Sequence, residues 1–482
     1  MLSTLVCQQG GPARGRGAGV TLFAAAAALW LVTGALARPQ VADPRYDAAI
    51  ELCRAAVGQL HRESGAPCVQ VAVAVDGEIV WSEAFGWADL ELRAPATART
   101  KIRIASVSKA LTGTLAAKLA SESRLDLDAP VQQYVGFPQK QAVITCRMLA
   151  GHTSGVRHYR GGETSSVRRY GSLEQALTIF AGDALEHDPG ADMTYSTYGY
   201  TLLGAAIEGA TGAEFGALLR EEILDPAGMT STVVDDAYAV VPERAACYEL
   251  AGPGQVRRAR PTDHSYKIPG GGLLSTAEDL VRFGSAMLAP GVFSEETLEL
   301  ALTSCTLNDG RATGYGLGWR VARSGAELMS FGHGGSQPGS RAYLHVDADS
   351  GIVVAALSNA TGAPLNRGEC ALIGEAFRAT DPATSDPDID AVGRYEMASR
   401  EHPERTATLE IWRAAGGDLR GGAVIEGRMI EFDAVGVAAD TVTMLGLAGN
   451  RLIRIRFSVD DEAISGALTA GDESAFAGRR LP

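Results

Sequence analysis

The spacing of apolar residues changes character several times along the chain, and each change predicts a different kind of element. Residues 47–63 have the spacing of an amphipathic helix. Residues 69–75 and 78–87 read as two strands joined by Asp76-Gly77, a pair typical of a type I′ hairpin turn. Residues 106–120 return to helical spacing. The chain therefore begins its first domain with a helix, a hairpin and a second helix.

Helical patterns alternate with turn-rich loops from residue 125 to about residue 260. Strand patterns return at residues 315–321, 342–346 and 352–358. Strands at both ends of a helical middle predict one sheet built from both ends of this region. The expected fold class is therefore α/β, with an antiparallel sheet flanked by helices and a helical subdomain inserted into it.

Residues 381–388 have linker composition, with two prolines and three aspartates in eight residues. We therefore predict a first domain at residues 46–378, a linker at 379–390 and a second domain at 391–482. Within this last part, residues 406–412 and 451–459 alternate apolar and polar side chains. It is expected to be a small antiparallel β domain.

Residues 18–37 are an apolar run that follows Arg14 and Arg16 and ends in Ala35-Leu36-Ala37. This pattern predicts a cleavable signal peptide at residues 1–37, and hence an exported protein, periplasmic or secreted. The alternative is an uncleaved membrane anchor, because about 20 apolar residues can span a bilayer. After cleavage we expect no stable membrane span.

Composition narrows the range of partners. The chain has 482 residues and a formal net charge of -14, which opposes binding to phosphate backbones, so nucleic acid is not an expected partner. No C-x-x-C or H-E-x-x-H occurs, so we predict no metal and no cofactor. The expected partner is a small-molecule or peptide substrate. Outside the signal the chain has six cysteines, which an oxidising compartment would allow to pair, with Cys53 and Cys68 as the leading pair.

The chain has only five lysines, and one of them follows a serine at helical spacing. Ser106 opens the predicted helix and Lys109 lies one turn later, so both project from one face. Desolvation at a helix start would favour a neutral lysine that can accept the serine proton. The alternative is a capped helix with a solvated lysine. Ser108 also carries a hydroxyl, but it points to another face of the helix.

Two further segments carry candidate chemistry. Tyr195 and Thr197 lie in a loop that precedes a helix ending at Gly212, where a phenol can reach into a site. The glycine-rich segment 332–339 precedes the strand at 342–346, and its glycines allow a ligand to approach the backbone closely. Taken alone, the tyrosines could be packing residues and the glycines a bulge or turn.

Together, these elements resemble the superfamily of serine beta-lactamases, D-Ala-D-Ala carboxypeptidases and penicillin-binding esterases. The segments Arg147-Met148-Leu149-Ala150-Gly151-His152-Thr153-Ser154-Gly155 and Pro269-Gly270-Gly271-Gly272-Leu273-Leu274-Ser275-Thr276 extend the resemblance, which covers residues 46–378. Within the superfamily, the phrases IRIASVSK, HTSGVRHY and SYKIPGGGLLST look most similar to the mitochondrial serine beta-lactamase-like group of animals.

The resemblance implies a role for each matching residue. Ser106 would be the nucleophile, Lys109 the base or proton conduit, and Tyr195 the acid/base toward the leaving group. The backbone N–H groups of Ser106 and Ser336 would form the oxyanion hole, and His152 would be structural. Other positions expected to bind the substrate are Thr197, His333, Gly334 and Gly335.

The chain departs from the superfamily pattern at two places. Thr197 replaces the usual asparagine, and His333-Gly334-Gly335 replaces the usual Lys-Thr-Gly. If unperturbed, His333 would titrate near pH 6.5. The expected activity is therefore hydrolysis of peptide, amide or ester substrates through an acyl-enzyme, with weak anchoring of beta-lactams.

Three other functions are alternatives to hydrolysis of peptide, amide or ester substrates through an acyl-enzyme. An α/β-hydrolase would need a Gly-x-Ser-x-Gly elbow, which does not occur. A beta-lactamase or D-Ala-D-Ala carboxypeptidase remains open as the substrate class. A non-catalytic binding or assembly protein with the same fold also remains open, although the presence of serine, lysine and tyrosine together argues against it.

Overall fold

The computed structural model describes residues 43–252, 254–378, 391–413, 419–425, 428–438, 441–448, 451–460, 463–469 and 473–481. The expected signal peptide and the expected linker lie outside these residues.

A seven-stranded sheet forms the centre of the first domain, and its strands come from both ends of that domain. The predicted hairpin is present, with Asp76 and Gly77 at φ 50° and 86° in its turn. Strand β1 pairs with β12, antiparallel, with Ala72 opposite Ala355. The predicted joining of early and late strands in one sheet is therefore confirmed. The strand order is β3-β2-β1-β12-β11-β10-β9, with β1 at Cys68–Val75, β2 at Glu78–Asp89, β3 at Ala94–Pro95, β9 at Arg320–Ser324, β10 at Glu327–Gln337, β11 at Ser340–Asp347 and β12 at Ile352–Ser358.

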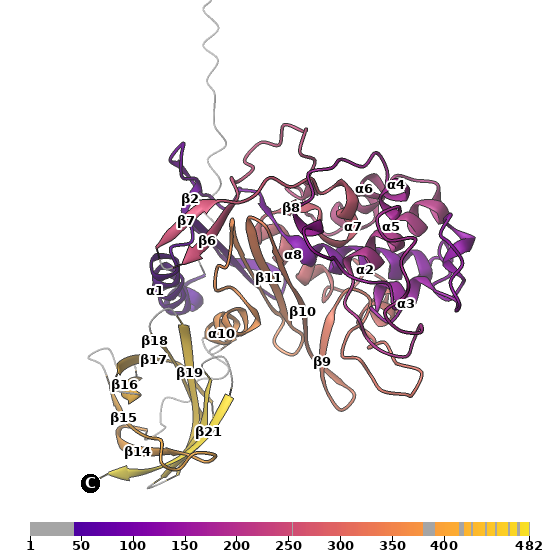
Figure 1. The fold of residues 1–482 in the computed structure, drawn as a ribbon. Coiled ribbons are helices and arrows are strands. Elements are labelled where there is room, and N and C mark those ends of the chain that lie inside the picture. Colours follow the sequence, from indigo (N-terminus) through magenta and orange to yellow (C-terminus); the bar gives the residue numbers. More distant parts are fainter. Residues whose placement is uncertain are drawn as a thin grey trace, which may run out of the picture. The chain divides into compact units, whose positions relative to one another are not determined.

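Helices cover both faces of this sheet (Figure 1). On one face, α1 (Asp47–Ser64) and α10 (Arg367–Arg378) pack with Val69, Val71 and Val73 of β1. On the other face, α8 (Ala277–Ala286) packs with Ala72 and Ala74. Both alternate sets of β1 side chains are therefore buried, which explains why the strand is almost continuously apolar.

This two-faced packing contradicts the expected Cys53–Cys68 pair. The six cysteines from Cys53 to Cys370 are all free thiols. Cys53 on α1 belongs to the core on one face of the sheet, whereas Cys68 on β1 belongs to the core on the other face. Because the sheet separates the two sulfur atoms, they cannot meet without a rearrangement of the backbone.

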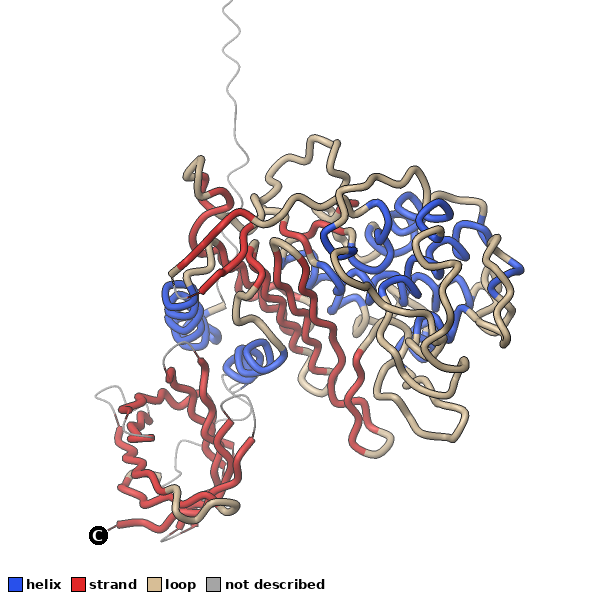
Figure 2. The backbone as a smooth tube through the Cα atoms, viewed as in Figure 1, coloured by secondary structure: helices blue, strands red, loops and turns tan. Residues whose placement is uncertain are grey.

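The helical subdomain lies to one side of the sheet and holds most of the helices between Arg103 and Arg320, apart from α8 (Figure 2). Helix α2 is buried along nearly its whole length, so it is a core helix and not an amphipathic one. Two short three-stranded sheets, β4-β8-β5 and β13-β6-β7, were not predicted. Their strands are β4 at Ile102–Arg103, β5 at Val233–Val234, β6 at Tyr248–Gly252, β7 at Gln255–Arg258, β8 at Leu273–Ser275 and β13 at Ala360–Thr361. The helices of this region are α2 at Ser108–Ser121, α3 at Cys146–Ala150, α4 at Leu173–Leu177, α5 at Thr197–Thr211, α6 at Phe215–Leu219, α7 at Ile268–Gly271 and α9 at Glu295–Leu302.

One strand prediction was misplaced. Residues 315–321 were expected to be extended, but the strand is Arg320–Ser324. Tyr315, Leu317 and Trp319 are buried, yet Gly314 and Gly318 have positive φ and interrupt the ladder. In addition, the glycine-rich segment predicted to precede a strand is itself largely the end of strand β10.

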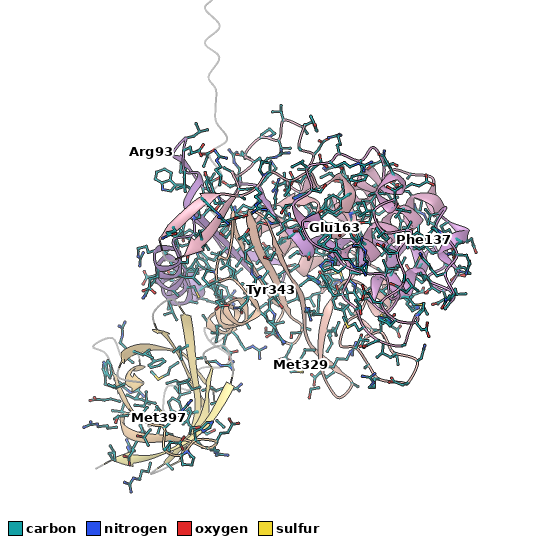
Figure 3. The ribbon with its side chains drawn as sticks, in the orientation of Figure 1. Arg93, Phe137, Glu163, Met329, Tyr343 and Met397 are labelled. Atoms are coloured by element: carbon teal, nitrogen blue, oxygen red, sulfur yellow. The ribbon has the colours of Figure 1, made fainter. Side chains whose placement is uncertain are left out.

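The C-terminal part is antiparallel β structure, as predicted. Strands β14 to β21 form a closed barrel in which β14 pairs with both β15 and β21. Its apolar core is made from its own side chains, including Met397, which Figure 3 labels. The strands are β14 at Gly393–Ser399, β15 at Thr406–Arg413, β16 at Leu419–Ile425, β17 at Arg428–Ala438, β18 at Thr441–Ala448, β19 at Arg451–Asp460, β20 at Ala463–Thr469 and β21 at Glu473–Leu481.

In the part of the chain that the structure describes, no single helix is long and apolar enough to cross a membrane. Residues Thr197–Thr211 and Phe215–Leu224 pass such a test only together, as a pair bent by 85°.

Candidate active site

Ser106 lies at a sharp change of direction between a strand and a helix. The short strand β4 (Ile102–Arg103) leads into the 3-10 turn Ala105–Val107, and α2 follows directly. Ala105 has φ 47°, which is unusual for a residue with a side chain and marks strain beside the serine. The turn holds Ser106 partly exposed while the residues on both sides of it are buried.

Lys109 is fully buried one helical turn beyond Ser106. Its Nζ lies 3.2 Å from Ser106 Oγ, 3.0 Å from Thr197 Oγ1 and 2.6 Å from the carbonyl oxygen of Gly270. The same segment is fixed to α2 by Thr112 Oγ1, which donates to the Pro269 carbonyl oxygen at 2.6 Å. The amine is thus held by groups from three separate elements.

The pKa of Lys109 lies well below its usual range, because burial disfavours the ammonium form and Lys267 adds a second positive charge nearby. A neutral amine has two N–H groups and one lone pair. The Gly270 carbonyl can only accept a hydrogen bond, and Thr197 Oγ1 can take the second N–H. The lone pair is then left for the hydroxyl proton of Ser106.

Tyr195 approaches Ser106 from the loop before α5. The Lys109 Nζ lies over its ring, 4.8 Å from the ring centre. Burial raises the pKa of Tyr195 to about 12, although the nearby Ser106 hydroxyl opposes this shift. The phenol is therefore protonated at neutral pH and can donate a proton.

Two histidines hold the tyrosine loop in place. His152 is buried, its ring centre lies 4.3 Å from that of Tyr195, and its Nδ1 accepts from the Ser196 backbone N–H at 3.1 Å. His158 Nδ1 accepts from the Thr197 N–H at 3.2 Å. Burial lowers the pKa of both, to about 4 for His158. Both are therefore neutral and act as positioning groups.

Strand β10 closes the opposite side of the site. A Cβ atom on Gly335 would overlap the carbonyl oxygen of Ile104 and would lie 3.1 Å from the Ala105 Cβ. Glycine at this position therefore lets the strand lie against the turn that carries the serine. Ser336 follows and is exposed in the pocket, where its backbone N–H can share an oxyanion with that of Ser106.

His333 differs from its sequence-based expectation. Its Nδ1 lies 2.7 Å from the Gly334 carbonyl oxygen, which fixes the proton on Nδ1, and Nε2 accepts from Tyr315 Oη at 2.9 Å. Burial lowers its pKa to about 3. The condition for titration near pH 6.5, an unperturbed imidazole, is therefore not met, and His333 does not line the pocket.

A pocket opens over Ser106, and it also exposes residues that the sequence analysis did not place in the site. These include Lys267, Gln337, Tyr159 and Glu249. Lys267 carried a usable signal, because it is one of only five lysines and lies in a segment that matches the superfamily. Gln337 carried none, since one glutamine after a glycine-rich run has no diagnostic spacing.

This arrangement combines a hydroxyl, a neutral amine, a protonated phenol and backbone donors in one pocket. Such a set can transfer an acyl group to serine and then to water. In the described part of the chain, no three His, Cys, Asp or Glu side chains are grouped so that they could hold a metal ion.

The fold and the site define a beta-lactamase-like architecture, with a main antiparallel sheet flanked by helices. The Beta-lactamase family model matches residues 53–375, and the chain belongs to this family. It is 33% identical over 310 residues to the mitochondrial serine beta-lactamase-like protein LACTB of Homo sapiens, a match that covers 50% of this chain and 56% of the relative. The chain thus spans about half the length of that relative.

Two solved structures show the same fold. One is the octameric penicillin-binding protein homologue from Pyrococcus abyssi, with a TM-score of 0.58 and 21% identity, over 88% of this chain and 99% of that one. The other is the D-amino acid amidase from Ochrobactrum anthropi SV3 complexed with L-phenylalanine, with a TM-score of 0.55 and 23% identity, over 64% of this chain and 91% of that one. A hydrolase of the Beta-lactamase family is therefore the class to which the site is assigned.

Proposed function

We propose that the protein is a serine hydrolase that cleaves amide, peptide or ester substrates through an acyl-enzyme on Ser106. The observation that carries the proposal is the position of the Lys109 amine. It is buried, held by Thr197 and Gly270, and 3.2 Å from Ser106 Oγ. A neutral amine at hydrogen-bonding distance from a serine hydroxyl is the arrangement that a general base requires.

The reaction divides into two acyl transfers. Ser106 Oγ attacks the substrate carbonyl carbon while its proton passes to Lys109 Nζ, and the oxyanion faces the N–H groups of Ser106 and Ser336. The bond to the leaving amine or alcohol then breaks as Tyr195 delivers a proton to it, and the tyrosine is reprotonated from Lys109. In the second transfer, water attacks the Ser106 ester, the same groups take its proton and return it to Ser106 Oγ as the ester bond breaks, and the acid is released.

Linear substrates fit this site better than bicyclic beta-lactams. The superfamily's usual lysine and threonine on β10 are replaced by His333, which is buried and neutral, and Gly334, which has no side chain. A penicillin or cephalosporin holds its carboxylate at a fixed short separation from its lactam carbonyl, so it needs a partner beside the oxyanion site. We expect poor turnover of these compounds and measurable turnover of small activated esters or short peptide amides.

Active-site labelling tests the nucleophile directly. We expect a fluorophosphonate probe to label the wild-type protein and Ser108→Ala, and not Ser106→Ala, with all three sharing one circular dichroism spectrum. Ser108 is the matched control because it is the neighbouring buried hydroxyl with no hydrogen-bond partner for Oγ among the described residues. Labelling of Ser106→Ala at the wild-type level would show that the nucleophile is misassigned.

Substrate profiling separates this function from its rivals. We expect hydrolysis of 4-nitrophenyl butyrate to exceed that of a chromogenic cephalosporin at pH 7.5. Comparable rates for the two substrates would restore beta-lactamase as the leading function. Absence of both labelling and hydrolysis would favour a non-catalytic binding protein on this fold.

A further inference from the structure

A second amine, Lys267, lines the same pocket as Ser106. It ends the 3-10 turn Ser265–Lys267 and is 2% exposed. Its Nζ lies 5.4 Å from the ring centre of Tyr266 and 5.5 Å from that of Tyr159. Within the described residues, the amine has no ion pair and no hydrogen bond. The side chain is therefore almost entirely buried, and its N–H groups have no acceptor among the described residues, so a ligand in the pocket can supply one.

The same pocket contains a second hydrogen-bond donor that has no acceptor among the described residues. Gln337, at the end of β10, is 8% exposed and lines the pocket. Its side-chain Nε2 is buried and has no hydrogen-bond partner among the described residues. Buried polar groups in folded proteins are nearly always paired, so an unpaired one in a pocket points to a missing acceptor. The Lys267 amine and the Gln337 amide come from different elements and line one pocket, so a single ligand can accept from both.

The acidic groups near Lys267 are already engaged by other cations. Asp235 Oδ2 accepts from Arg103 Nε at 2.8 Å and lies 2.8 Å from His264 Nδ1. Glu249, which also lines the pocket, forms an ion pair with Arg257 at 2.8 Å. Neither carboxylate is paired with Lys267. The pocket therefore offers a cation and an amide donor, and its own acids do not satisfy them.

We propose that Lys267 and Gln337 form a carboxylate-binding subsite, so that the preferred substrates are amides or esters that carry a free carboxylate. A carboxylate has only acceptors, and it can take a charged hydrogen bond from the lysine and a neutral one from the glutamine. The proposal rests on the proposed function, because it names the substrate class of the same site.

Binding through Lys267 should depend on pH. Burial lowers the pKa of Lys267 to about 7, and Arg103 adds to this effect, whereas Asp235 opposes it. A bound carboxylate favours the ammonium form, so affinity is greatest below this pKa and falls as the pH rises through it. The other titratable groups that face the amine or share its pocket are Lys109, His158, His264, Tyr159, Tyr266 and Glu249.

Matched substrate pairs test the subsite. The first pair, mono-4-nitrophenyl glutarate and 4-nitrophenyl butyrate, differs in a carboxylate on the acyl side. The second pair, 4-acetoxybenzoate and 4-acetoxybenzamide, differs in a carboxylate on the leaving group.

In wild type at pH 6.5, we expect the carboxylate-bearing ester to have a lower KM than its neutral partner in at least one pair. We expect Lys267→Met to raise that KM about tenfold or more, as a charged hydrogen bond warrants, and to leave the neutral partner nearly unchanged. Gln337→Leu should act in the same direction with a smaller effect.

Lys101→Met is the matched control, because it removes the same charge from a lysine that contacts the Pro242 carbonyl oxygen and does not line the pocket. We expect it to leave both KM values unchanged. If Lys267→Met does not fold, the carboxylate-binding subsite can be tested in wild type alone, through inhibition of 4-nitrophenyl butyrate hydrolysis. Benzoate should inhibit competitively, and more strongly at pH 6 than at pH 8, whereas benzamide should not.

The two proposals fail in different ways. If wild type hydrolyses none of the four esters, the proposed function fails. If it hydrolyses both neutral esters, but neither pair discriminates and benzoate inhibits no better than benzamide, the carboxylate subsite fails while the hydrolase stands. An unchanged KM for the acid in a folded Lys267→Met protein would also overturn the subsite.

Discussion

Gly335 on β10 lies so close to Ile104 that a Cβ atom on the glycine would overlap the Ile104 carbonyl oxygen. Ile104 is the residue before the 3-10 turn that carries Ser106, so this contact sets the distance between the two proposed oxyanion donors. The relationship is between backbone atoms, and no rotation of a side chain can relieve an overlap there.

Gly335→Ala should therefore separate β10 from the serine turn. We expect kcat/KM for 4-nitrophenyl butyrate to fall about 10²-fold or more, the cost of losing one oxyanion donor, while the protein stays folded. Gly182→Ala is the control, because a Cβ atom at residue 182 would meet nothing within 4 Å. Equal activity of the two variants would show that β10 is not positioned by this contact.

Lys109 and Tyr195 should act as one proton relay. Lys109→Met and Tyr195→Phe should each lower the rate of acylation by about 10²–10⁴, because each removes a group that moves a proton in the transition state. The double variant should lose less than the product of the two effects. Single-turnover kinetics with an activated ester measures each rate, and strictly multiplicative losses would assign the residues separate tasks.

The pH dependence of acylation should report the unusual environment of Lys109. Its neutral form is the base, so kcat/KM for a neutral ester should rise as the pH rises through the pKa of Lys109 and then level off. Because burial and Lys267 lower that pKa well below its usual range, the rise should occur far below the region where ordinary lysines titrate. A rise centred near the ordinary value of 10.5 would contradict the neutral-amine arrangement.

Four buried histidines should make the fold sensitive to acid. The pKa values of His152, His264, His333 and His345 are all lowered by burial, to about 3 for His264 and His333 and about 4 for His345. The unfolded chain binds protons near pH 6.5 and the folded chain does not, so the free energy of unfolding is fully present above this pH and falls below it.

Each of these histidines adds about 1.4 kcal/mol per pH unit to that slope, so the four together add about 5 kcal/mol per unit below pH 6. Urea denaturation between pH 7.5 and pH 5 measures the slope. We expect His345→Gln to reduce it by the share of one histidine, since His345 lies outside the site. A free energy of unfolding that is unchanged over this range would contradict the prediction.

The C-terminal barrel should be separable from the hydrolase domain. Its core is built from side chains between Ala391 and Phe476, all beyond the predicted linker. We therefore expect a chain ending at Arg378 to unfold cooperatively and to retain hydrolysis of neutral esters. Thermal unfolding and an esterase assay measure this. An insoluble truncated chain, with the full chain soluble, would mean that the two domains share a core.

Much of the architecture could be predicted from local sequence patterns. Some elements depend only on residues a few positions apart, so their spacing in the sequence is enough to predict them. Examples are the Asp76-Gly77 turn, the helix from Asp47 and the alternating residues of β19. The grouping of Ser106, Lys109 and Tyr195 was also predictable, because serine and lysine share one helical turn and the tyrosine motif accompanies them in the family.

Other features were decided only when distant segments packed together. Cys53 and Cys68 are close in sequence, but the sheet places them in different cores. The pKa of His333 is about 3, far below that of a free imidazole, because the side chain is buried beside Tyr315. Lys267 and Gln337 line one pocket although they are 70 residues apart in the sequence. Local sequence spacing cannot predict that the two side chains lie close together. Burial and long-range contacts determine which side chains are charged and which side chains contact each other in this protein. Both depend on the whole fold.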